Sequence, residues 1–324
     1  MYPLNRNRRL RTKETLRSLI RETVITPNDF LVPLFVIEGE NKKEEIQSMP
    51  NYFKMSIDVL LKEIKILQSL GLKSVLLFAQ VNQGLKDNYG SEAINKNGLM
   101  QRAIKSIKDK YPDILVMTDV ALDPYSSNGH DGVVENGLIM NDITNDILSK
   151  MSLTHIEAGA DFVAPSDMMD GRVKAIRTLF ESEGYYNAGI MSYSAKYASC
   201  FYGPFRDALD SKPGFGDKKT YQMDIGNRNE AINEVKLDIQ EGADIIMIKP
   251  GISYLDIIRD IKNNFNIPIS AYQVSGEYAM IKSAAKNGWL NEDQAILETS
   301  IAFKRAGANF IASYFAKDVV KLIS

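Results

Sequence analysis

Eight short apolar runs, separated by stretches long enough to form helices, limit the folds open to this 324-residue chain. Their hydrophobicity is continuous rather than alternating, which is typical of strands covered on both faces in a parallel sheet. The runs are Leu31–Ile37, Ser74–Ala79, Leu115–Leu122, Phe162–Pro165, Gly189–Tyr193, Ile245–Ile248, Ile267–Val274 and Phe310–Phe315. We therefore predict an α/β fold, a (β/α)8 TIM barrel, with an open doubly wound sheet as the alternative.

Glycines near the ends of the intervening helical stretches support the same arrangement. Gly71, Gly159, Gly242 and Gly307 each lie shortly before an apolar run. A glycine at such a place supplies the left-handed residue that commonly ends a helix. In a barrel built this way, the chemistry belongs to polar side chains at the C-terminal ends of the strands.

The chain is predicted to divide into an N-terminal oligomerisation arm, residues 1–30, and a catalytic barrel, residues 31–324. Between Arg6 and Arg21, seven basic residues face a single acid, Glu14. A basic segment of this kind is also found in targeting peptides, but we favour an arm that docks on a neighbouring subunit.

Composition excludes several classes of function. The formal net charge is −2, so there is no overall basic field to hold nucleic acid or an anionic membrane. No apolar stretch is long enough for a membrane span and no signal-peptide core is present, so we expect a cytoplasmic protein. Cys200 is the only cysteine and His130 and His155 are the only histidines. This excludes a disulfide framework and a multi-cysteine zinc site, and leaves catalysis mainly to Lys, Asp, Glu, Tyr and Ser.

Two lysines follow apolar runs where the barrel mouth is expected. Lys249 comes directly after Ile245–Ile248, and Lys196 lies just past Gly189–Tyr193. An apolar surrounding and a second nearby ammonium both lower the pKa of a lysine, and a neutral amine is what attacks a ketone to form an imine. The alternative is that both lysines reach solvent or pair with carboxylates.

Five segments, two of which contain these lysines, resemble the porphobilinogen synthase (5-aminolevulinate dehydratase) family. They span almost the whole chain in the family's order. The segments are Thr118–Tyr125, Val163–Val173, Met191–Arg206, Met247–Gly251 and Tyr272–Tyr278. The resemblance implies a lyase of tetrapyrrole (heme) biosynthesis that condenses two molecules of 5-aminolevulinate to porphobilinogen. It also implies that Lys249 forms the Schiff base with the first substrate, while Lys196 forms a second imine or assists at the other site.

The resemblance also assigns the two substrate carboxylates. Ser275 and Tyr314 match the hydroxyls that bind the first carboxylate, and Arg206, Lys218 and Gln222 match the residues that bind the second. All five side chains carry hydrogen-bond donors that suit a carboxylate.

Lys218 departs from the family, which usually has arginine there. A lysine cannot form the two-pronged contact that arginine makes with a carboxylate. The segment around it is bracketed by Gly203–Pro204 and Pro213–Gly216. We interpret it as a mobile lid that closes on substrate, with a plain solvated loop as the alternative.

The zinc-binding cysteines of some family members are missing here. Their positions hold Ala121, Asp123 and Asp131, so the expected ligands are hard oxygens that suit magnesium or a monovalent cation. A hydrogen-bonding network without a cation is the alternative. Asp119, at a strand end, is expected to hold a substrate amine or to influence a lysine pKa, and Ser166 is a further candidate for substrate binding.

The resemblance places an allosteric magnesium ion at Glu234, held mostly through water at a subunit boundary. From its sequence context alone, Glu234 looks like an ordinary exposed acid of a helix. The family also implies a homo-octamer, with a hexamer as the alternative, and no organic cofactor.

Two other functions remain open at this point. A class I aldolase on the same barrel would need only one imine-forming lysine, although no glycine-rich phosphate cradle follows the last strands. A catalytically silent barrel could instead serve as a binding module.

Overall fold

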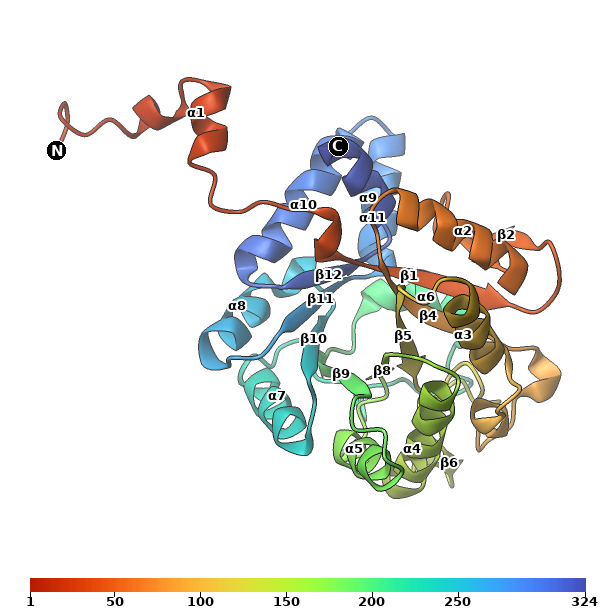
Figure 1. Cartoon of the computed structure of the whole chain (residues 1–324). Helices are drawn as coiled ribbons and strands as arrows, with labels where there is room; N and C mark the ends of the chain where they lie inside the picture. The colour runs from red at the N-terminus through yellow and green to blue at the C-terminus, as the bar shows by residue number, and fades with distance from the viewer.

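The computed structural model describes all 324 residues and confirms the closed parallel barrel (Figure 1). Eight parallel strands follow one another around the barrel in chain order, and pairing of the last strand with the first closes it. The strands are β1 (Phe30–Ile37), β4 (Ser74–Gln80), β5 (Leu115–Val120), β8 (Phe162–Pro165), β9 (Gly189–Lys196), β10 (Ile245–Lys249), β11 (Ile269–Gln273) and β12 (Phe310–Ser313). All eight apolar runs therefore form barrel strands, with bounds that differ by a few residues.

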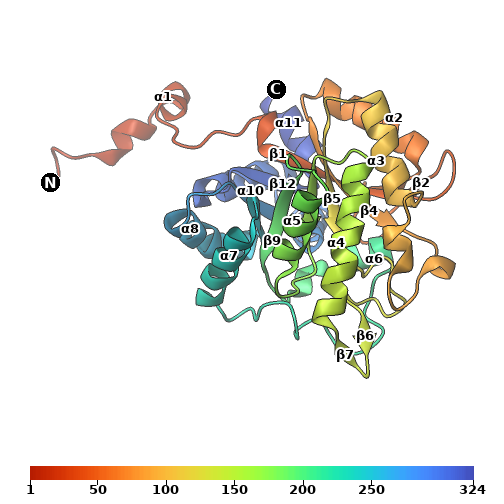
Figure 2. The ribbon, with the colours of Figure 1, turned by 60° about the horizontal axis from the view of Figure 1, so that its bottom comes forward.

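Helices surround the strands on the outside, as Figures 1 and 2 show. They are α2 (Ile57–Ser69), α3 (Leu99–Lys110), α4 (Asn141–Glu157), α5 (Arg172–Ser182), α7 (Asn229–Glu241), α8 (Leu255–Asn264), α9 (Ser275–Lys286), α10 (Glu292–Ala306) and α11 (Ala316–Ile323). A short additional helix, α6 (Gly203–Leu209), follows β9. The strands are thus covered on both faces, which explains their continuous hydrophobicity.

Left-handed glycines end two of these helices. Gly242 closes α7 at φ 104° and Gly307 follows α10 at φ 127°. An L side chain rarely adopts such a backbone conformation, so the glycine lets the chain turn sharply into the next strand. Gly71 and Gly159 also have positive φ. The predicted helix ends are confirmed at all four positions.

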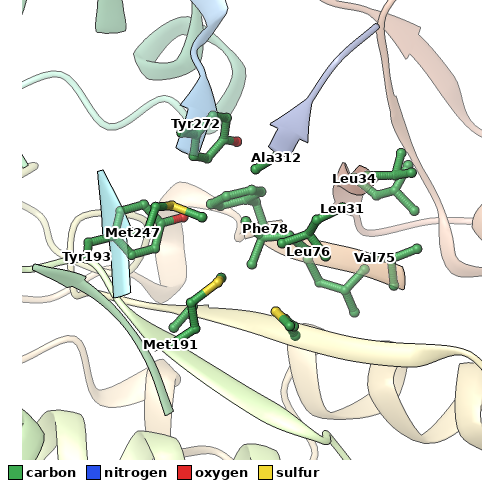
Figure 3. Close-up of a cluster of buried hydrophobic side chains, with 14 of the residues drawn as sticks. Leu31, Leu34, Val75, Leu76, Phe78, Met191, Tyr193, Met247, Tyr272 and Ala312 are labelled. Carbon is green, nitrogen blue, oxygen red and sulfur yellow. The ribbon is translucent and has the colours of Figure 1, made fainter. Parts of the chain in front are cut away.

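The barrel interior is packed with side chains rather than open. Leu31, Leu76, Phe78, Met191 and Met247 point into it from four strands (Figure 3), and each is at most 1% exposed. Layers of large apolar side chains of this kind fill the centre of a TIM barrel. Space for chemistry is therefore left only at the ends of the strands.

Four short strands were not predicted. β2 (Lys43–Glu45) and β3 (Phe53–Met55) extend the sheet beside β1, and β6 (Val134–Glu135) pairs with β7 (Leu138–Ile139) as a small hairpin before α4. Each has only two or three residues, too few for a recognisable hydrophobic pattern.

The N-terminal segment projects away from the barrel (Figures 1 and 2). It contains α1 (Glu14–Leu19) and two short 3-10 helices, Asn7–Arg11 and Pro27–Asp29, and no residue before Phe30 is buried. Leu4 and Leu19 are 79% and 80% exposed. No helix of the protein has both the length and the apolar character that crossing a membrane requires.

Candidate active site

Lys196 and Lys249 lie side by side on adjacent strands. Lys249 is the last residue of β10, as expected, and its register partner on β9 is Lys196. Lys196 was predicted in the loop after β9, but β9 continues to include it, which corrects that boundary. Both side chains open on the C-terminal end of the barrel, and the two residues are 6% and 5% exposed.

A bulge in β9 creates this pairing. Ser192 pairs with Ile246 and Ala195 with Ile248. Between these two pairs β9 therefore advances three residues while β10 advances two. The extra residue shifts all later β9 residues by one position relative to β10. Without it, Ala195 rather than Lys196 would lie opposite Lys249. The bulge therefore brings the two amines into register.

Four aromatic rings surround the Lys249 ammonium. Its Nζ lies 5.1 Å from the ring centroid of Tyr193, 5.0 Å from Tyr202, 4.7 Å from Phe205 and 4.8 Å from Tyr272. Rings exclude water and leave the ammonium poorly hydrated. Burial, reinforced by the neighbouring lysine, lowers the pKa of Lys249 to about 7. A large fraction of this amine is therefore neutral, and nucleophilic, near neutral pH.

Beside the lysine pair, a third ammonium binds two buried carboxylates. Lys218 Nζ lies 3.2 Å from Asp123 and also donates to Asp131. Asp131 additionally pairs with Lys196, at 3.3 Å. All four residues are at most 6% exposed. Ion pairs this deeply buried interact strongly because no water screens them.

The charges of this cluster determine which groups ionise. Burial alone would raise the pKa of Asp131, but Lys196 and Lys218 lower it to about 2. Burial alone would lower the pKa of Lys218, but Asp123 and Asp131 raise it. Asp131 is therefore an anion and Lys218 a cation across the physiological range.

Asp119 has a different environment. Burial and then neighbouring Asp123 raise the pKa of Asp119 to about 7, and its Oδ1 has no hydrogen-bond partner. Lys196 and Lys249 act in the opposite direction. Asp119 and Lys249 are thus both half-ionised near pH 7, which suits transfer of a proton. Ser166, also predicted here, accepts a hydrogen bond from Lys196 through its backbone carbonyl.

The predicted carboxylate-binding residues fall on the two sides of the lysine pair. Arg206 and Gln222 line the same small cavity as both lysines, together with Lys218. Gln222 is buried and its Oε1 has no partner. The structure brings these three residues together as expected, although Lys218 is already bound to two carboxylates.

Ser275 and Tyr314 lie on the Lys249 side. The Tyr314 hydroxyl is 3.0 Å from that of Tyr272, one of the rings around Lys249. Ser275 Oγ accepts a hydrogen bond of 2.9 Å from the Phe205 amide. Each hydroxyl therefore contacts a residue whose ring contacts the Lys249 amine, Tyr272 in one case and Phe205 in the other.

The acidic positions expected to hold an active-site cation do not fit one in this arrangement. Asp123 and Asp131 share the ammonium of Lys218, which lies between them. The protein contains no group of three or more His, Cys, Asp or Glu side chains placed to bind a metal ion. A metal between these carboxylates would have to displace Lys218.

Glu234 lies apart from the lysines. It lines a cavity of about 900 Å³ with Asp170 and Glu230, and Gln222 lies between this cavity and the smaller one at the lysines. Burial raises the pKa of Glu234, while Arg172 opposes that change. Glu234 is thus half-buried beside other acids, rather than the ordinary exposed acid that its sequence context alone indicated. One carboxylate with several waters is a common way to bind Mg²⁺.

Several residues of the site were not assigned a role from the sequence. Glu277 is fully buried, and its two carboxylate oxygens accept hydrogen bonds from the amides of Val274, at 2.8 Å, and Ile252, at 2.7 Å. It thereby ties the loop after Lys249 to the start of α9, which carries Ser275. Glu277 follows Ser275 by two residues, and an acid in a first helical turn was the only available signal.

The rings around Lys249 were also missed as functional residues. Tyr193 belongs to an apolar run and was interpreted as core, and Phe205 lies in the segment interpreted as a lid. Only the fold shows that they converge on one nitrogen.

Comparison with known proteins agrees with this geometry. A family model described as delta-aminolevulinic acid dehydratase matches residues 4–322. The chain is 51% identical over 312 residues to the delta-aminolevulinic acid dehydratase of Bradyrhizobium diazoefficiens, covering 96% of this chain and 88% of that protein. It is 51% identical over 322 residues to the enzyme of the same name from Methanothermus sociabilis, covering 99% of each.

A solved structure shows the same fold in detail. It is the crystal structure of delta-aminolevulinic acid dehydratase (porphobilinogen synthase) from Toxoplasma gondii ME49, in complex with the reaction product porphobilinogen. The TM-score is 0.96 at 48% identity, and the match covers 98% of this chain and 91% of that one.

Proposed function

We propose that this chain, which belongs to the delta-aminolevulinic acid dehydratase family, condenses two molecules of 5-aminolevulinate to porphobilinogen, with loss of two waters, through an imine on Lys249. The observation that carries the proposal is the in-register lysine pair, in which one amine has a pKa of about 7. An aldolase would need only one such lysine, and a silent barrel would need neither.

The first step is attack of the neutral Lys249 amine on the ketone of one substrate. The resulting carbinolamine loses water when its hydroxyl gains a proton and the nitrogen lone pair forms the C=N bond. Asp119, with a pKa of about 7 and a free Oδ1, is the group suited to supply that proton. The four rings around Lys249 then stabilise the cationic iminium while keeping water out.

The second substrate binds on the Lys196 side. Lys196 is held by Asp131 and by the Ser166 carbonyl, so its position is fixed. It forms the second imine or holds the second ketone for carbon–carbon bond formation. The amine of the first substrate then attacks the ketone carbon of the second, or its imine with Lys196, and closes the ring, which releases the remaining water; elimination of the Lys249 amine from the ring carbon frees that lysine.

The two substrate carboxylates bind at opposite sides. Ser275 and Tyr314 bind the first one, since both hydroxyls lie next to the rings around Lys249. Arg206 and Gln222, with the remaining N–H of Lys218, bind the second one, because they line the cavity shared by both lysines. Fixed donors of this kind orient the two ketones for reaction.

Assembly and magnesium form a separate part of the proposal. None of residues 1–29 is buried, and apolar side chains such as Leu4 and Leu19 are exposed, which suits the predicted arm, residues 1–30, packing on a neighbouring subunit in a homo-octamer. Glu234 would hold a magnesium ion through water near that boundary and stabilise the assembly. A hexamer is the alternative. Light scattering of the protein with and without residues 1–25 separates the two assemblies and shows whether the larger one depends on the arm. We also place the protein in the cytoplasm.

The central test is reduction with borohydride in the presence of 5-aminolevulinate. It should attach the substrate to Lys249, located by peptide mass mapping, and Lys249→Ala should lose nearly all turnover while remaining folded. Lys150→Met, at an exposed lysine of α4, is the matched control. An active wild-type preparation that shows no modification of Lys249 would contradict the assignment, and a colour test for the pyrrole product distinguishes this reaction from an aldolase or a silent barrel.

A further inference from the structure

We infer that the ammonium of Lys218 is a built-in cation of the active site, which takes the place of a metal ion between Asp123 and Asp131. The inference rests on the proposed function only for what that cation does to substrate. Its test measures cation binding, so failure of this inference and failure of the proposed reaction are distinguishable.

The geometry is that of a buried cation site filled by a side chain. Lys218 Nζ contacts one carboxylate oxygen of Asp123, at 3.2 Å, and one of Asp131. The three residues are 5%, 6% and 1% exposed, so water does not compete for these contacts. The two acids come from the loop after β5, and the lysine comes from the segment after α6. Two segments that are far apart in the sequence thus meet at one cluster of three charged side chains.

The charge balance requires a cation at this place. Buried carboxylates are strongly destabilising unless they are paired and hydrogen-bonded. Asp131 has two cationic partners, Lys196 and Lys218, but Asp123 has Lys218 alone. Removal of the Lys218 charge would leave Asp123 without a partner and Asp131 with one. The Lys218 charge is therefore needed to balance the two carboxylates of Asp123 and Asp131.

Lys218 Nζ lies within ion-pair distance of both acids, 3.2 Å from Asp123 and 2.5 Å from Asp131. A metal ion would bind the same carboxylate oxygens, at about 2.0–2.1 Å for Mg²⁺ or about 2.3–2.6 Å for Ca²⁺, and would need the same space. Because Nζ lies between the acids, a metal ion and Lys218 exclude one another. While Lys218 occupies this position, the site is not available to a soluble cation.

The test is equilibrium binding of Mn²⁺ to metal-stripped, full-length protein, read by electron paramagnetic resonance. Lys218→Met keeps the length and removes the charge, so this variant should bind one more Mn²⁺ per chain than wild type. The additional site should be absent from Lys218→Arg, which keeps the charge, and from the double variant Lys218→Met, Asp123→Asn, which removes a ligand. Comparison between these variants cancels any Mn²⁺ held near Glu234.

Asp123→Asn alone supplies the decisive control. In the wild-type background it should leave Mn²⁺ binding unchanged, because Lys218 already occupies the site. A loss of Mn²⁺ from this single variant, or a folded Lys218→Met variant without an additional ion, overturns the inference. If circular dichroism shows that Lys218→Met does not fold, the Asp123→Asn measurement decides the question alone, with unchanged binding as support and lost binding as refutation.

Discussion

Lys196→Met tests whether one lysine prepares the other for catalysis. Paired parallel strands lie about 4.8 Å apart, so two in-register ammonium groups are separated by about 6 Å when they point alike. At an effective dielectric constant of about 20, their repulsion is about 3 kcal/mol, which corresponds to about 2 pH units. Removing the Lys196 charge should therefore raise the pKa of Lys249 from about 7 to about 9. Burial is the larger cause and remains, so the ordinary value is not restored.

The assay is the pH dependence of covalent trapping at Lys249. Levulinate, which has the keto acid of the substrate without its amine, is reduced onto the protein by cyanoborohydride between pH 6 and 10, and the product is quantified by intact mass. At pH 7 about half of the wild-type amine is neutral but only about 1% in the variant, so trapping should fall about 50-fold.

The midpoint of the pH profile is more informative than the rate. It should move upward in Lys196→Met and stay in place in Lys150→Met. Unchanged midpoints in both variants would refute repulsion between the lysines. A wild-type midpoint near that of free lysine would refute the effect of burial as well.

Three further changes test the surrounding structure. Lys249→Met should raise the free energy of unfolding at pH 7, by at most about 5 kcal/mol, because the lysine binds its proton more weakly when folded. Between pH 7 and 10.5 the unfolded wild type holds more protons, so its stability rises with pH and the difference in urea melts should disappear towards pH 10.5. Glu277→Gln should lower the unfolding free energy by about 2 to 3 kcal/mol, since one buried backbone N–H loses its acceptor, whereas Glu298→Gln, at an exposed acid, should not change the urea midpoint. Gly251→Ala would place its Cβ 2.1 Å from a ring carbon of Phe303, so the loop after Lys249 must shift, and the initial rate of pyrrole formation should fall about 100-fold.

The fold was accessible from the sequence because its pattern is local. Continuous apolar runs identified all eight strands, and Gly242 and Gly307 marked helix ends by a backbone conformation that other residues avoid. Lys249 was recognisable as the residue after an apolar run. These features depend on neighbours in the chain and need no knowledge of distant contacts.

The remaining part of the site depends on contacts between distant segments. The bulge in β9 adds one residue against β10, and no sequence pattern showed that it would place Lys196 opposite Lys249. Lys218 was expected to bind a substrate carboxylate, but its position between Asp123 and Asp131 arises only when two loops meet. Such long-range charge pairing has no periodicity to detect.

Lys218 also lies on the segment interpreted as a lid, between α6 and α7. If that segment opens for substrate to enter, it withdraws a positive charge from two acids at the same moment. Access of substrate to the site and the electric field within it would then change together. A lid made only of apolar side chains would change access alone. Each opening would expose Asp123 to water, and each closure would expel that water and return the Lys218 ammonium to the two acids beside the reacting ketones.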